Sequence, residues 1–91
     1  MKPVCLVIGA GAGIGGHVGK HFASEGYHAV LCRRSDEDGL RKLVGDIEGA
    51  GGSASGFILN ASDPDTLEER IAEVEAEIGP IEVVVFNLGA Q

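Results

Sequence analysis

The residues best suited to chemistry in this chain are the glycines at positions 9 to 16. The stretch GAGAGIGG directly follows the apolar run VCLVI, residues 4–8, and leads into a segment with helical spacing. A strand that enters a glycine turn and then a helix directs backbone N–H groups and the positive end of the helix towards one point. Such a point favours an anion, so the glycine spacing must show which phosphate-bearing ligand it fits.

A Walker A loop does not fit this spacing. That loop ends in Gly-Lys followed by Ser or Thr, with another glycine five residues before the glycine of the pair. Here Gly19 and Lys20 are followed by His21, and Ile14 occupies the earlier place. The sequence therefore fails the Walker A pattern at two positions.

The dinucleotide-binding pattern fits better in a modified spacing. Gly9 and Gly11 begin the common Gly-x-Gly-x-x-Gly fingerprint, but its third glycine would be Ile14. The spacing that fits the whole loop is Gly9-x-x-x-Gly13-x-Gly15. Other motifs are needed to interpret it, because a glycine-rich loop alone is weak evidence.

Further polar motifs close the other apolar runs. CRRS, LNASD and FNLGA close the second, third and fourth runs in turn. Each falls at the carboxyl end of an expected strand, where doubly wound sheets bind ligands. Together with the glycine spacing, these motifs resemble the short-chain dehydrogenase/reductase (SDR) family over essentially the whole chain. The resemblance implies a nicotinamide coenzyme and hydride transfer to or from a small alcohol or carbonyl substrate.

The resemblance gives each loop glycine a physical role. Gly9 permits the tight turn, Gly13 lets the backbone approach the pyrophosphate, and Gly15 allows the helix to pack closely on the sheet. Ala12 and Ile14 lie within the same motif and are assigned to the coenzyme with them. The alternative interpretation is that these glycines serve only turns and packing.

Arg33 and Arg34 predict which coenzyme binds. An NAD-preferring site usually places Asp or Glu about 20 residues beyond the loop, where it accepts hydrogen bonds from the ribose hydroxyls. Two arginines can instead pair with a 2′-phosphate through charge-assisted bonds. We therefore predict NADP(H) over NAD(H), the alternative being that the arginines are surface cations of an acidic chain.

A rival class uses a similar loop. Gly9, Gly11 and Gly13 also resemble the Gly-x-Gly-x-Gly loop of S-adenosylmethionine-dependent methyltransferases. Those proteins have an acidic partner after the second strand, and their ligand carries no phosphate. The two arginines argue against this interpretation.

The resemblance also assigns residues after the third and fourth apolar runs. Asn60 and Ala61 stand where the family commonly has Asp and a small residue, and the Asn60 amide oxygen can still accept a hydrogen bond from the adenine amino group. Capping or turn formation is an equally open role for Asn60. Residues 86–89 align with the family's Asn-Asn-Ala-Gly, of which Asn87 and Gly89 match.

No residue of this chain is assigned a catalytic role. The family's acid/base residues, a Tyr-x-x-x-Lys pair and an upstream Ser, follow the fourth strand. The one tyrosine, Tyr27, precedes the second apolar run and has no lysine at that spacing. His17 and His21 are four residues apart, but no third ligand follows at a recognisable spacing, so a helix surface is favoured over a metal site.

The elements that position these residues are four apolar runs and three segments of helical spacing. The runs VCLVI (4–8), AVLC (29–32), GFIL (56–59) and VVVF (83–86) are continuous, as expected of strands covered on both faces. The helical segments carry three apolar stripes: Ile14, Val18 and Phe22; Leu40, Leu43, Val44 and Ile47; Leu67, Ile71, Val74 and Ile78. This alternation predicts an α/β fold, a Rossmann-type doubly wound parallel sheet with strand order 3-2-1-4.

The predicted strand order leaves the run VVVF as an open edge. Natural sheets normally cover or charge such an edge, which predicts a domain truncated after the fourth strand. Residues 1–91 would then be the NADP-binding, N-terminal part of a longer SDR-like domain. The alternative is a non-catalytic nucleotide-binding or interaction module whose edge is covered by a partner strand.

Composition restricts the partners. The chain of 91 residues has a net charge of −7, which argues against nucleic acid and anionic membranes. The first apolar run is too short for a signal peptide or a membrane span, so a cytoplasmic protein is expected. Cys5 and Cys32 lie in apolar runs and predict two buried thiols. The family is often dimeric or tetrameric, so the parent chain is a candidate homo-oligomer.

Overall fold

The protein is described by a computed structural model that places residues 2–9, 14–33, 37–58 and 64–86. Strands and helices alternate along these residues: β1 Val4–Ile8, α1 Ile14–Ser24, β2 His28–Arg33, α2 Glu37–Gly49, β3 Ser53–Ile58, α3 Pro64–Glu77 and β4 Ile81–Phe86. All the strands pair in parallel in the order β3-β2-β1-β4. The predicted fold class and strand order are confirmed.

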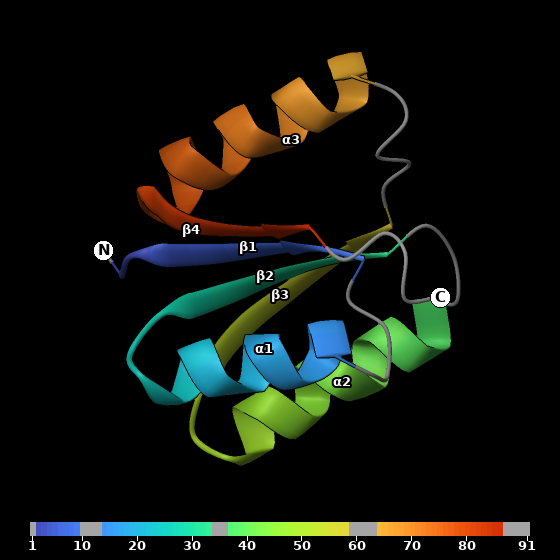
Figure 1. The fold of residues 1–91 in the computed structure, drawn as a ribbon, viewed down its shortest axis with the longest axis vertical. Coiled ribbons are helices and arrows are strands. Elements are labelled where there is room, and N and C mark those ends of the chain that lie inside the picture. The colour runs from blue at the N-terminus through green and yellow to red at the C-terminus, as the bar shows by residue number, and fades with distance from the viewer. Residues whose placement is uncertain (1, 10–13, 34–36, 59–63, 87–91) are drawn as a thin grey trace.

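The sheet lies between two helical layers. Helices α1 and α2 cover one face and α3 covers the other (Figure 1). This is the arrangement that right-handed crossovers give when the chain reverses its direction of winding after β3. The sheet is therefore doubly wound, with the switch point between β1 and β4.

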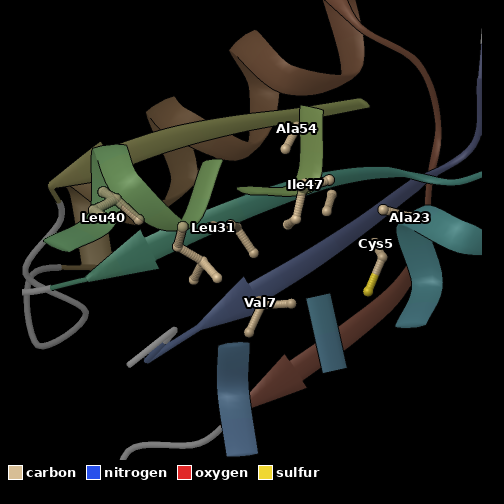
Figure 2. Close-up of a cluster of buried hydrophobic side chains, with 9 residues drawn as sticks. Cys5, Val7, Ala23, Leu31, Leu40, Ile47 and Ala54 are labelled. Atoms are coloured by element: carbon tan, nitrogen blue, oxygen red, sulfur yellow. The ribbon is translucent and has the colours of Figure 1, made fainter. Parts of the chain in front are cut away.

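Each face of the sheet has its own hydrophobic core. The first core lies beneath α1 and α2, and Figure 2 shows Leu31 of β2 between Leu40 and Ile47 of α2 and Val7 of β1. The second core lies beneath α3, where Val74 is only 1% exposed. The predicted stripes of α2 and α3 both belong to these cores.

The apolar stripe of α1 differs from the prediction. Val18 and Phe22 are only half-buried and pack at the border of the first core. From residue 16 onwards, where burial in α1 is described, the buried positions are held by small residues, Gly16, Gly19 and Ala23. The line of closest approach to the sheet therefore runs along glycine and alanine, which allows the helix backbone to lie near β2.

Strand β3 begins earlier than its apolar run indicates. It starts at Ser53 because Ser53 and Ser55 pair with β2 and hold His28 between them. The His28 ring nitrogens lie 2.5 Å from the Ser53 hydroxyl oxygen and 2.8 Å from the Ser55 hydroxyl oxygen. Burial lowers the pKa of this imidazole. The predicted end of this run, at position 59, lies outside the described residues.

The edge strands are less covered than continuous apolar runs predict. All five residues of β1 are buried, whereas Ala54 is the one buried residue of β3 and the residues of β4 alternate between half-buried and exposed. Val84 and Phe86 are 51% and 59% exposed on the face that α3 covers only in part. Glu82 is an extra residue in the pairing of β4 with β1, since Val4 pairs with Ile81 and Cys5 pairs with Val83.

Because two thiols are buried, we expect the protein to lose stability at alkaline pH. Cys5 and Cys32 are free and buried, and burial raises the pKa of each to about 11 from an ordinary 9.0. Because the folded pKa is the higher one, the stabilisation is present below pH 9 and is lost as the pH rises through about 11. We expect the free energy of unfolding to fall by roughly 2 kcal/mol for each thiol over that pH range.

Denaturant unfolding measured at intervals from pH 7 to 11 checks this prediction. The Cys5→Ala/Cys32→Ala variant is the control, because it keeps every other titrating group. A pH dependence as steep in that variant as in the wild type would contradict the assignment to the thiols.

Candidate coenzyme site

The carboxyl ends of the strands and the first turns of the helices meet at one edge of the sheet. This follows from the parallel pairing, which aligns Ile8 with Cys32 and Phe86, and Arg33 with Ile58. Helices α1, α2 and α3 each start shortly after one of these strand ends. Their backbone N–H groups make this edge attractive to an anion.

Gly9 makes the turn that leaves β1. Its φ of 92° lies in the left-handed region, which glycine adopts without the steric cost that a Cβ brings. Its backbone N–H donates a hydrogen bond to the carbonyl oxygen of Cys32 at 2.8 Å. This φ is the conformation that the predicted turn requires at Gly9, and the bond holds Gly9 against the end of β2.

Arg33 is the last residue of β2 and follows directly on Cys32. It is half-buried and engages in an interaction within the protein. The Gly9–Cys32 hydrogen bond therefore joins the glycine turn to the strand end that carries this arginine. The Gly9 turn and Arg33, which carries a guanidinium group, therefore lie at the same edge of the sheet.

The other residues of the predicted site are described only in part. Ile14 and Gly15 form the first turn of α1. Ala12, Gly13, Arg34, Asn60, Ala61, Asn87 and Gly89 lie outside the described residues. Their contacts with a coenzyme remain predictions from the resemblance.

A groove beside this edge was missed by sequence reasoning. It has a volume of about 290 Å³ and lies between α2 and the outer strand β3; its lining residues are Glu37, Leu40, Arg41, Val44, Gly56 and Ile58. Arg41 forms an exposed ion pair with Glu37 at 3.2 Å and lies 3.9 Å from Asp38. These carboxylates add negative charge to the first turn of α2. The i, i+4 spacing of Arg41 and Glu37 is the only sequence signal for the pair.

Residues set aside as non-catalytic lie away from this edge or on the surface. Tyr27 precedes β2, at the amino edge of the sheet, and stacks edge-to-face on Phe22 with ring centroids 5.3 Å apart. His17 and His21 are exposed on α1. Within the described part of the chain, no group of three or more His, Cys, Asp and Glu residues could hold a metal ion. None of the described helices has the length and apolar character needed to cross a membrane.

The fold and this edge together define a class of protein. A parallel sheet of order 3-2-1-4 with helices on both faces, and a glycine turn at its carboxyl edge, is a Rossmann-type nucleotide-binding fold. The family model for short chain dehydrogenases matches residues 3–91. The chain therefore belongs to the SDR family.

Individual relatives agree with this assignment. The 3-oxoacyl-[acyl-carrier-protein] reductase FabG of Thermotoga maritima is 36% identical over 86 residues, which cover 94% of this chain and 35% of that protein. A short-chain dehydrogenase from Rhodopseudomonas palustris superposes with a TM-score of 0.88 at 38% identity, over 98% of this chain and 41% of that one. A metagenomic short-chain oxidoreductase in complex with NADP gives a TM-score of 0.83 at 32% identity, over 90% of this chain and 37% of its own.

The matched region is a limited part of these proteins. The chain spans about a third of the length of the curated relatives it matches, and it corresponds to their N-terminal part.

Proposed function

We propose that this chain is the coenzyme-binding part of an NADP(H)-dependent oxidoreductase that transfers a hydride between the coenzyme and an alcohol or carbonyl substrate. The nicotinamide would supply the hydride. The residues of this chain would bind and orient the coenzyme, and the acid/base groups would come from the rest of the parent protein. The proposal rests on membership of the SDR family.

One observation carries the choice of coenzyme. The Gly9–Cys32 hydrogen bond links the pyrophosphate-directed turn to the strand end that bears Arg33. In a dinucleotide site, the group after the second strand contacts the adenosine ribose. A guanidinium at that place favours a 2′-phosphate over a free hydroxyl, because it donates bidentate, charge-assisted hydrogen bonds. The NADP complex of a relative at 32% identity supports the same choice.

The relatives also support a carbonyl substrate. One is a 3-oxoacyl-[acyl-carrier-protein] reductase and another a ketoacyl reductase associated with polyketide synthesis. We extend only the common chemistry, reduction of a ketone, to the parent of this chain. Substrate loops in such folds follow later strands, so the substrate would be selected by other parts of the parent protein.

The test is coenzyme oxidation by the native gene product. NADPH and NADH are supplied separately with a panel of ketones that includes 3-oxoacyl thioesters, and the loss of reduced coenzyme is followed. We expect turnover with at least one ketone, faster with NADPH than with NADH. Coenzyme binding without turnover of any ketone in the panel would favour a non-catalytic nucleotide-binding module over the enzyme.

A further inference from the structure

Helix α1 meets strand β2 most closely at Gly19. A Cβ placed on Gly19 would lie 2.7 Å from Cδ2 of Leu31, closer than real Cβ contacts come, and 4.0 Å from Cδ1 of Ile47. Leu31 is completely buried between the sheet and the helices. A side chain at position 19 would therefore push against a packed core with little room to yield.

This contact sets how deeply the helix sits on the sheet. Gly19 is buried, whereas its larger neighbours on the predicted stripe, Val18 and Phe22, are only half-buried. A glycine in a helix interior destabilises that helix relative to alanine. At Gly19 this cost is offset, because an alanine Cβ at that position would clash with Leu31.

The distance of α1 from the sheet determines where the first turn of the helix lies at the carboxyl edge. The helix begins at Ile14, five residues before Gly19, and Gly9 is fixed to β2 by its hydrogen bond to Cys32. A rigid helix pushed outward at Gly19 therefore moves its first turn away from the strand ends. That turn belongs to the loop and helix start that would face the coenzyme pyrophosphate.

We propose that Gly19 is a positioning residue for the coenzyme. By leaving space for Leu31, it seats α1 at the depth that brings the first turn of the helix to the pyrophosphate. This inference rests on the proposed function, because it concerns the same coenzyme. It assigns the close helix–sheet approach to Gly19, outside the Gly9, Gly13 and Gly15 motif.

The test compares Gly19→Ala with Gly45→Ala in the native gene product. Both substitutions replace a helical glycine, but nothing lies within 4 Å of a Cβ at Gly45. We expect Gly19→Ala to raise the dissociation constants of NADPH and NADH by the same factor, between about 10- and 100-fold, because both coenzymes share the pyrophosphate. Gly45→Ala should leave both constants unchanged.

A rescue variant separates positioning from a general loss of structure. Leu31→Val removes the δ carbons that meet the new Cβ, so Gly19→Ala/Leu31→Val should recover most of the lost affinity. If Gly19→Ala alone does not fold, coenzyme affinity is measured in the double variant instead. An affinity loss that persists in the folded double variant would overturn the inference.

The outcomes also distinguish this inference from the proposed function. If the wild type binds neither coenzyme, the proposed function fails and the inference fails with it. If the wild type binds NADPH and Gly19→Ala binds it equally well, whatever its melting temperature, only the inference is overturned.

Discussion

Replacing Arg33 and Arg34 with alanine should weaken NADPH binding by about 100-fold or more, because each charge-assisted bond to phosphate is worth roughly 1.5–3 kcal/mol. NADH has no 2′-phosphate, so its affinity should change little. The preference of the native gene product for NADPH should therefore disappear. Calorimetric titration of wild type and variant with each coenzyme measures this effect.

The control for this prediction removes the same charge elsewhere. Lys2 precedes β1 at the amino edge, Lys42 lies on α2, and both are exposed. Lys2→Ala/Lys42→Ala makes the net charge more negative by the same amount as the arginine variant. If this control lost NADPH affinity to the same extent, the effect would come from the overall field of an acidic protein and not from the two arginines.

Gly9→Ala should weaken the binding of both coenzymes by at least about tenfold. The reason is that the substitution would distort the turn that directs the backbone at the pyrophosphate. The substitution forces a side chain into a φ of 92°, which should also cost about 1–2 kcal/mol of unfolding free energy. Coenzyme titration and denaturant unfolding of the same variant measure the two effects.

Two other glycines are matched controls for this variant. Gly26 and Gly51 have φ values of 95° and 90° and lie in turns before β2 and β3, at the amino edge. Gly26→Ala and Gly51→Ala should lose similar stability while retaining coenzyme affinity. Equal affinity losses in all three variants would show that binding follows global stability and not the turn at Gly9.

The sequence predicted the architecture well because the architecture depends on hydrophobic periodicity. The run at 4–8 matches β1 from end to end, and the apolar spacing of α2 and α3 matches the faces that they bury. The reversal of winding in the connection from β3 to β4 is the doubly wound pattern, and right-handed connections then place α3 on the opposite face of the sheet from α1 and α2. No residue-specific chemistry was needed for these predictions.

The predictions from the sequence were wrong where polar or small residues determine the structure. The early start of β3 depends on Ser53 and Ser55 holding His28, and such a cross-strand contact between polar residues has no periodic signal. The buried face of α1 centres on Gly19, which contributes nothing to a hydrophobic stripe. A hydrophobic pattern records only the apolar side chains. These two features instead depend on hydrogen bonds between polar side chains and on the small size of glycine.

The candidate site was predicted to a different degree from the fold. Gly9 has the predicted turn conformation, and Arg33 ends its strand at the expected edge. The groove between α2 and β3 was not predicted, because its lining residues come from two elements far apart in sequence. The roles of Gly13, Asn60 and Asn87 rest on the family resemblance, which relates motif positions to a ligand that spacing alone does not identify.

Whether this chain binds NADP(H) is best decided by calorimetric titration of the native gene product with NADPH, NADH and S-adenosylmethionine. We expect one NADPH site per chain, with an affinity at least about tenfold higher than for NADH, because even one charge-assisted bond to the 2′-phosphate is worth this much. Equal affinity for NADPH and NADH would contradict the role of the arginines. Binding of S-adenosylmethionine without a response to NADPH would contradict the coenzyme assignment as a whole.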